Sequence, residues 1–349
     1  MNVVEQIWAD LTKLGFSEAE HTFPALHAWL RRIRLTHTLP VGTLTKTGFR
    51  TKRVQFSGLL FAMKGKFGEA YCADRLEGGT TDICYIKTSP EHPQGLLLEG
   101  ILQSIAHTVL RVYGFPRAVP RVLDIFQHPT QGIAISLERA TGAKLFADWL
   151  EHGLQWGHPS VSNDRLLCEV LAQIATYMAV LEDVIGMNHR DLKGTNVLMI
   201  AANQPVHQTV ECGSARWKIK TQNQAILIDF GFACMGKSDG TRIVSAGEYL
   251  PELDFCPKEG RDCFLFLASL WNVEQFRKSV TPALANHFHK WLRSNVETKW
   301  ADWLQTYTPT NMDSMYLLTN ASHFRSTPCS PKSILRDISK LYSSIVEFE

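Results

Sequence analysis

Two short segments combine side chains that could carry out chemistry together. The first is the octapeptide HRDLKGTN from His189 to Asn196, and the second is the tripeptide DFG that begins at Asp229. A carboxylate can accept a proton, a nearby lysine can balance negative charge, and Asn196 and Asp229 offer the hard oxygen atoms that magnesium prefers. The first pattern has a chance frequency of about one in ten thousand in a chain of this length. These residue types suit proton transfer beside a negatively charged group and a magnesium ion.

The two motifs resemble the catalytic loop and the metal-binding segment of the eukaryotic-type protein kinases, and the resemblance covers about residues 55–349. It implies an α+β, two-lobed protein-kinase-like fold, with a small β-rich N-lobe and a larger helical C-lobe. It also implies transfer of the ATP γ-phosphate to serine or threonine hydroxyls of a protein substrate. Asp191 would be the catalytic base, and Lys193, typical of serine/threonine kinases, would contact the transferred phosphate. Asn196 and Asp229 would hold Mg²⁺.

The resemblance implies a further ion pair in the N-lobe. Lys87, in the strand sequence CYIK, resembles the lysine that binds the α- and β-phosphates. That lysine needs a carboxylate on the following helix, and Glu99 is the acid in the right place. Glu91 lies only four residues beyond Lys87, too close to return from a helix. The spacing between Lys87 and Glu99 is short for the family.

The segment MKGKFGEA resembles a glycine-rich phosphate-binding loop, in which glycines let backbone amides approach phosphates. The nucleotide-binding residues that it implies are Gly65, Phe67, Gly68 and Ala70. The segment departs from the family pattern at Met63, where the first glycine would stand, and at Ala70, where valine is usual. Tyr85 replaces an alanine and should share a strand face with Lys87, so it could narrow the adenine pocket.

The order of the remaining elements implies an adenine-binding linker in the segment LERATGAKLF. Leu137 would gate the back of the pocket. Glu138 and Ala140 would offer backbone hydrogen bonds to adenine, and Leu198 would form the pocket floor.

An activation segment is expected between Asp229 and Pro251-Glu252, which resembles the end of the family's APE motif. Its hydroxyl side chains are Ser238, Thr241, Ser245 and Tyr249. A phosphate on one of them could pair with Arg190; ordinary polar loop residues are an equally good interpretation. Asp262 resembles the aspartate that braces the catalytic loop.

Hydrophobic periodicity indicates the elements that would position these residues. Strands are predicted at 54–63, 69–76 and 81–88 and in RAVPRVLDIFQ and GIAISLE, and helices at 94–112, in LFADWLEHG and at 163–185, capped by Ser162 or Asn163. The strands NVLMIAA and AILIDF would pair. The expected units are a basic, partly helical extension at 1–54, an N-lobe at 55–139 and a C-lobe at 140–349, with a hairpin insertion at about 203–224.

Composition fits a folded chain of 349 residues, with 36 Lys+Arg, 34 Asp+Glu and a net charge of +2. Residues 21–68 contain nine basic and no acidic side chains. This block is either a solvated face or a docking surface for an acidic partner. No sequence motif favours binding of nucleic acid. No apolar run is long enough to span a membrane, and the first residues do not resemble a signal peptide. The eight cysteines lack a C-x-x-C pair, so reduced thiols and an intracellular location are expected.

Two other functions remain open. Met63, Tyr85 and the sequence DCFLFL, which lacks the family's tryptophan and glycine after Asp262, would also suit a pseudokinase or scaffold that binds nucleotide or partners without efficient transfer. A small-molecule kinase would share the fold and the catalytic aspartate, but the complete HRDLK run and Pro251-Glu252 resemble protein kinases more closely.

Overall fold

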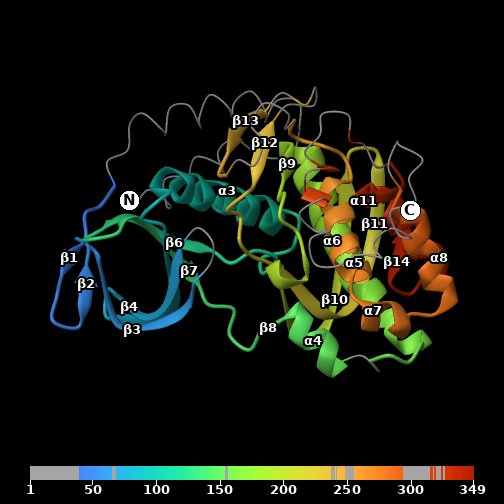
Figure 1. Cartoon of the computed structure of the whole chain (residues 1–349), viewed down its shortest axis with the longest axis horizontal. Coiled ribbons are helices and arrows are strands. Elements are labelled where there is room, and N and C mark those ends of the chain that lie inside the picture. The colour runs from blue at the N-terminus through green and yellow to red at the C-terminus, as the bar shows by residue number, and fades with distance from the viewer. Residues whose placement is uncertain are drawn as a thin grey trace.

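The computed structural model describes residues 39–64, 68–153, 156–236, 240, 242–247, 255–293, 315–316, 318–319, 324 and 327–349. Within these residues the chain contains seven α-helices and three antiparallel sheets (Figure 1). The fold is therefore mixed, with separate regions of strand and helix. The helices predicted in residues 1–35 lie outside the described part of the chain.

A curled, seven-stranded antiparallel sheet forms one end of the molecule (Figure 1). Its strands follow the order β1-β2-β3-β4-β5-β7-β6. Their bounds are Thr43–Leu44 (β1), Gly48–Arg50 (β2), Val54–Lys64 (β3), Glu69–Glu77 (β4), Thr80–Thr88 (β5), Val122–His128 (β6) and Gly132–Glu138 (β7). The five strands predicted from residue 54 onward are confirmed. The sequence pattern missed β1 and β2, which extend the sheet on the N-terminal side of residue 55.

The two faces of this sheet are covered differently. On the inner face, Phe49, Phe56 and Phe126 pack together with ring centroids 4.9 to 5.4 Å apart. Helix α3 (Pro93–Val112) covers the β6–β7 part of the other face. The approach is close because a Cβ atom on Gly100 would lie 3.0 Å from the side chain of Ile135. Glycine at position 100 therefore allows the helix to lie against the sheet.

The remaining helices lie at the opposite end of the molecule (Figure 1). They are α4 (Phe146–Gly153), α5 (Val161–Ile185), α6 (Arg261–Trp271), α7 (Glu274–Ser279), α8 (Pro282–Trp291) and α11 (Pro331–Leu341). The predicted cap of α5 is wrong: Ser160 caps it, accepting a 3.1 Å hydrogen bond from the amide of Asn163. Several neighbouring polar residues could cap a helix there, and Ser160 is the one with extended backbone immediately before the first turn.

A long hairpin, β10 (Val197–Cys212) and β11 (Ala215–Leu227), crosses this helical region. The predicted extension of the hairpin through residues 203–224 is confirmed. The hairpin is joined by β8 (Lys144–Leu145) and by β14 (Val346–Phe348), which was not predicted. The third sheet contains β9 (Met187–Asn188), β12 (Cys234–Gly236) and β13 (Arg242–Ser245). Among the described helices, none combines the length and the apolar character needed to cross a membrane.

The prediction that all cysteines are reduced is wrong for one pair. Cys234 in β12 and Cys256 form a disulfide, with their Cα atoms 6.3 Å apart. The spacing of 22 residues gave no sign of the bond, because tertiary structure brings the two cysteines together. The carbonyl oxygen of Gly186 accepts a 3.0 Å hydrogen bond from the amide of Gly236 in β12 and lies 3.8 Å from Sγ of Cys256. One of the grounds for expecting an intracellular location is thereby removed.

Candidate active site

Lys87 joins three separate segments of the chain. Its Nζ atom lies 2.8 and 3.0 Å from the two carboxylate oxygens of Glu99 and 2.7 Å from Oδ1 of Asp229. Strand β5 carries the lysine, α3 carries Glu99, and Asp229 follows the end of β11. The spacing of 12 residues suffices for the first contact because α3 begins only a few residues after β5. The short connection thus explains a departure from the family spacing.

Burial and charge oppose each other in this cluster. Burial raises the pKa of Glu99, and the charge of Lys87 offsets part of that effect. Burial alone would lower the pKa of Lys87, but the two carboxylates raise it above its ordinary value. For Asp229, whose side chain is 45% exposed, partial loss of hydration would raise the pKa, yet the charge and hydrogen bond of Lys87 hold the pKa below its usual range. The cation therefore favours the ionised form of Asp229.

Asp191 lies in a second, buried cluster. Lys193 Nζ lies 2.9 and 3.0 Å from its two carboxylate oxygens, and Asn196 Nδ2 lies 2.8 Å from Oδ2. The hydroxyl of Tyr316 donates a hydrogen bond to Oδ1. The exposed fraction of Asp191 is 7%. The geometry thus brings together Asp191, Lys193 and Asn196, which the motif singled out, and adds a fourth residue, Tyr316, which the sequence did not indicate.

Both motifs contain backbone in an uncommon conformation. Arg190 and Asp229, with φ of 67° and 65°, are the two non-glycine residues with positive φ in the described part of the chain. This conformation costs about 1–3 kcal/mol and persists where surrounding contacts impose it. Asp262 supplies such contacts, accepting from the amides of His189 at 2.8 Å and Arg190 at 2.7 Å. The predicted contact of Asp262 with the HRD segment is confirmed.

Hydrogen bonds hold the two motifs side by side. The amide of Ile228 donates to the carbonyl of Asn196 at 3.0 Å, and a ring nitrogen of His189 lies 3.0 Å from the carbonyl of Ile228. The His189 ring also packs on Phe230, with centroids 4.7 Å apart. Asn196 and Asp229 are therefore close together on neighbouring backbone.

This donor set fits magnesium shared with phosphate oxygens. Asn196 uses its Nδ2 atom for both of its hydrogen bonds to Asp191, so its oxygen points away from them. The side chain of Asp229 is 45% exposed and within reach of a ligand from solvent. Within the described ranges, no group of three or more His, Cys, Asp or Glu side chains is placed to hold a metal alone. A metal ion here would need ligands from a phosphate as well, which is usual for magnesium.

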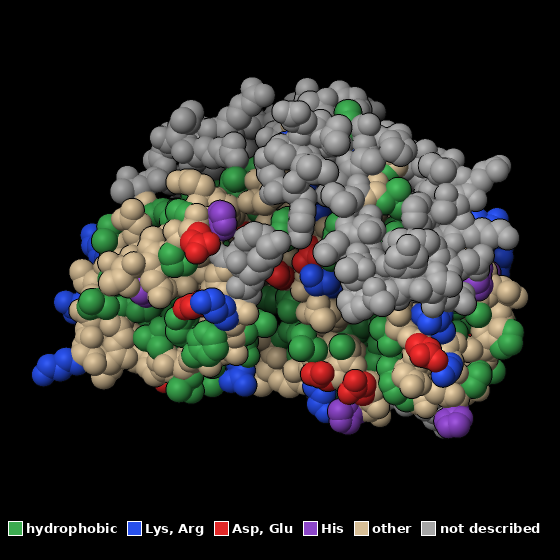
Figure 2. Space-filling view, in the orientation of Figure 1, with side chains coloured by type: hydrophobic (Ala, Val, Ile, Leu, Met, Phe, Trp, Pro, Cys, Tyr) green, Lys and Arg blue, Asp and Glu red, His purple; other side chains and the backbone are tan. Residues whose placement is uncertain are grey.

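The predicted nucleotide-contacting residues of the first sheet share one face. Opposite positions of antiparallel strands project to the same side, and Ala70 pairs with Lys87 while Leu137 pairs with Tyr85. Tyr85 and Lys87 are half-buried, whereas their neighbours Cys84 and Ile86 are fully buried on the opposite face. Figure 2 shows the surface hollowed between the sheet and the helical region, with hydrophobic and charged side chains inside the hollow.

The glycine-rich loop is described in part. Gly65 and Phe67 lie outside the described residues. A Cβ atom on Gly68 would come within 2.1 Å of the carbonyl of Thr88, so no larger residue fits the observed backbone. Met63 pairs with Ala70 at the end of β3 and is exposed. The departure at Met63 therefore places a flexible apolar side chain on the surface.

The predicted linker follows β7 directly. The amide of Glu138 donates to the carbonyl of Arg121 at 2.8 Å, and the carbonyl of Ala140 accepts from the amide of Ala143 at 3.1 Å. Leu198 lies in a different sheet, where it pairs with Leu145 and Ile226. The structure thus places Leu137, Glu138 and Ala140 together but shows no contact that assigns them to adenine.

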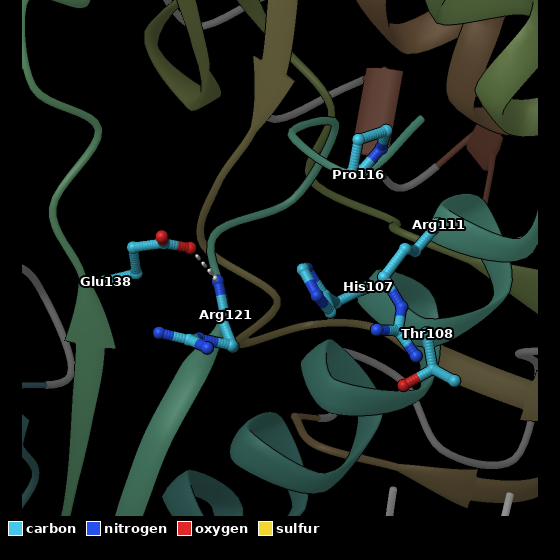
Figure 3. Close-up of a pocket in the computed structure, with 6 residues that line it drawn as sticks. All are labelled: His107, Thr108, Arg111, Pro116, Arg121 and Glu138. Carbon is cyan, nitrogen blue, oxygen red and sulfur yellow. Dashed lines mark hydrogen bonds between the residues drawn. The ribbon is translucent and has the colours of Figure 1, made fainter. Parts of the chain in front are cut away.

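Two cavities lie beside the linker without including the motif residues. One, of about 230 Å³, is lined by His107, Thr108, Arg111, Pro116, Arg121 and Glu138 (Figure 3). There the amide of Arg121 donates to the carboxylate of Glu138 at 3.3 Å. The other, of about 240 Å³, includes Glu138, Arg139, Ala140 and Ile226. Neither cavity contains Lys87, Asp191 or Asp229, so neither coincides with the candidate site.

Arg190 contacts the predicted activation segment. Its guanidinium donates to the hydroxyl of Ser245 at 2.7 Å and to the carbonyl of Gly247 at 3.0 Å. Ser245 and Gly247 both lie within the loop that the Cys234–Cys256 disulfide closes. Ser238, Thr241, Tyr249, Pro251 and Glu252 lie outside the described residues.

The described part of the basic block, residues 39–64, is partly neutralised by acids of β4. Arg53 pairs with Glu77 at 3.2 Å and Lys64 with Glu69 at 3.5 Å. These pairs are exposed, so they hold the side chains weakly. The net positive potential near the glycine-rich loop is smaller than the sequence count suggested.

No protein-family model matches the chain, and a comparison with curated proteins finds no significant similarity. What the site can do is therefore inferred from its own residues.

Proposed function

We propose that the chain is a serine/threonine protein kinase with the two-lobed kinase fold. The observation that carries the proposal is the bridge from Lys87 to Glu99 and Asp229, residues 12 and 142 positions away. A lysine paired with a helix carboxylate, beside a second carboxylate that can hold a metal ion, is what binding of a triphosphate with magnesium requires in protein kinases. The braced backbone at Arg190 and Asp229 supports the same function, since strained non-glycine residues cluster at active sites.

Each residue has a role that follows from its contacts. Lys87 would bind the phosphates, and Glu99 would hold the lysine in place. Asp191 would orient the acceptor hydroxyl and take its proton, while Lys193, already at the carboxylate, would balance charge on the transferred group. Asn196 and Asp229 would hold Mg²⁺, which would neutralise phosphate charge.

The linker and the sheet face would receive the nucleotide base. Ala70, Tyr85 and Leu137 lie on the face that carries Lys87. The proposal assigns adenine to the space between this face and Leu198, with hydrogen bonds from the backbone of Glu138 and Ala140. Gly65, Phe67 and Gly68 would cover the phosphates.

A nucleotide-binding scaffold is the second candidate function. It is favoured by Tyr85, whose bulky ring shares the face of Lys87, and by the coverage of Asp191 by Tyr316. A thermal shift assay with millimolar ATP and magnesium tests for nucleotide binding, because a ligand that binds the folded chain raises its melting temperature. Stabilisation without phosphate transfer would favour the scaffold.

The test of the kinase proposal is phosphate transfer to dephosphorylated casein by the purified chain with magnesium and labelled ATP. Asp191→Asn should lower the rate by about 100-fold or more, because it removes the proton acceptor while keeping the shape of the side chain. Asp148→Asn, at an exposed position of α4, is the matched control and should keep full activity. Equal activity of the Asp191→Asn variant would refute the proposal, and transfer to a sugar or aminoglycoside but to no protein would indicate a small-molecule kinase.

A further inference from the structure

Tyr316 occupies the position beside Asp191 that an acceptor hydroxyl would need. Its hydroxyl donates to Oδ1 of Asp191 across 125 positions of sequence. The exposed fractions of the two residues are 8% and 7%, so the ring covers the carboxylate. Lys193 Nζ lies 5.8 Å from the centroid of the same ring, within the range of a cation–π contact.

Further contacts fix the backbone around Tyr316. The carbonyl of Thr319 accepts a 2.9 Å hydrogen bond from Nζ of Lys258, which is 1% exposed. The hydroxyl of Thr319 donates to the carbonyl of Tyr316 at 3.2 Å. Nearby, Phe324 packs on Phe264 of α6, with ring centroids 5.3 Å apart. The position of the Tyr316 hydroxyl is therefore held from both the side chain and the backbone.

We propose that Tyr316 is an internal phosphate acceptor, modified by the chain's own active site; this inference rests on the proposed kinase function. In the step, Oη of Tyr316 forms a bond to the γ-phosphorus of a magnesium-bound nucleoside triphosphate. The bond from that phosphorus to the bridging oxygen breaks, the nucleoside diphosphate leaves with that oxygen, and the hydroxyl proton passes to Asp191.

Placement accounts for a tyrosine acceptor in an active site expected to prefer serine and threonine. A reacting group held beside the catalytic carboxylate has an effective concentration of about 10⁵ M or more in favourable cases. Such proximity would compensate for the use of tyrosine in a site that is expected to prefer serine or threonine. The preference for serine and threonine would then apply to acceptors that arrive from solution.

The phosphorylated side chain of Tyr316 would not keep the position of the unmodified side chain beside Asp191. A phosphotyrosine carries a charge of about −1.5 to −2 and no donor proton for the Asp191 carboxylate. Repulsion between the two anions would displace the ring, and Lys193 alone could not balance both. The modification would therefore uncover Asp191 for a protein substrate.

The first experiment measures phosphate on Tyr316 by mass spectrometry after incubation of the full chain with magnesium and ATP. We expect Tyr316 to be modified at a rate that stays constant over a 100-fold dilution, as an intramolecular reaction requires. A tagged Asp191→Asn chain mixed with the wild-type chain should stay unmodified at Tyr316. A rate that falls with dilution, or modification of the tagged chain, would overturn the proposal.

Casein phosphorylation in the same samples separates the two proposals. Labelled casein with unmodified Tyr316 would refute the internal acceptor and leave the kinase proposal standing. The absence of both labels would count against the kinase function itself.

A second measurement needs no nucleotide. Tyr316→Phe keeps the ring but removes the hydrogen bond to Asp191, so amide hydrogen exchange in a peptide containing residues 315–319 should be faster by several-fold. Tyr342→Phe, at another partly buried tyrosine, is the control and should leave that peptide unchanged. Identical exchange in the wild-type and Tyr316→Phe chains would show that the hydroxyl does not hold the segment, which would contradict the proposal.

Discussion

Lys87 and Glu99 are 12 residues apart and share two hydrogen bonds of 2.8 and 3.0 Å across the β5–α3 connection. Glu99 is 3% exposed, and within this pair its charge is compensated by the lysine. The pair therefore fixes the position of α3 relative to the sheet as well as the position of the cation.

Removal of the cation alone should destabilise the chain. Lys87→Met leaves Glu99 buried without its counter-ion, which we expect to lower the free energy of unfolding by about 3 kcal/mol. The double variant Lys87→Met/Glu99→Gln should recover much of that loss, because the buried position 99 is then neutral and the remaining carboxylate, Asp229, is 45% exposed. Urea unfolding of the single and double variants measures the coupling, with Lys52→Met as an exposed control. Additive losses would show that the pair is not coupled.

Substitution of Asp262 should affect both the stability of the chain and the conformation of the HRD segment, because its carboxylate accepts two backbone hydrogen bonds from that segment. Asp262→Asn replaces one of the two oxygens that accept from the amides of His189 and Arg190, and it sets an amide group against a backbone N–H. We expect a loss of about 1–3 kcal/mol in unfolding free energy. We also expect a fall in the phosphate-transfer rate that exceeds any change in the KM for ATP. Urea unfolding and steady-state kinetics measure the two effects, and a variant with wild-type stability and rate would contradict the bracing role.

The disulfide gives a prediction that is independent of function. Of the eight cysteines, Cys234 and Cys256 are bonded, so thiol titration of the unreduced, denatured chain should find six free thiols. Cys234→Ser should lower the free energy of unfolding by about 3 kcal/mol, the value expected for a closed loop of about 20 residues. Added reductant should destabilise the wild-type chain but leave the Cys234→Ser variant unchanged. A titration of eight thiols would show that the bond does not form.

Asp337 should make stability depend on pH in the acidic range. Burial would raise the pKa of Asp337, but hydrogen bonds from Lys290 and Trp291 outweigh it and hold the pKa below its usual value. A carboxyl group with a lowered pKa stabilises the fold above its unfolded pKa of about 3.9, and this contribution is lost as pH falls through the folded value.

We therefore expect Asp337→Asn to cost about 2 kcal/mol between pH 5 and 7 and less below about pH 4. Urea titrations at several pH values measure the difference between the variant and the wild-type chain. A difference that grows as pH falls would contradict the assignment.

Local patterns predicted most of the elements around the site. β-Branched and aromatic residues between glycine turns predicted β3, β4 and β5, and the helix expected from about Gln94 is α3. Strand β14 was missed because three residues near Phe348 carry little pattern of their own, and pairing with β11 determines their structure. Strands this short depend on tertiary contacts.

The motifs likewise located Lys87, Asp191, Asn196 and Asp229, since each lies in a dense local signature. Tyr316 could not be found in this way. It lies 125 positions from Asp191, in a segment that resembles an ordinary apolar stretch of a helix. The contact between the Tyr316 hydroxyl and the Asp191 carboxylate becomes visible only when the chain is folded.

The pairing of β14 with β11 also bears on the order in which the chain is made. Trp217 lies opposite Phe348, and the side chain of Glu349 bonds to Arg216. At a synthesis rate of about 5–20 residues per second, the partner strand emerges about 130 positions later, so this edge of the hairpin stays open for roughly ten seconds. An open strand edge can pair with another chain. The nascent protein is therefore open to misassembly at this edge during that interval, and the arrival of three residues closes the part from Trp217 to Ile219.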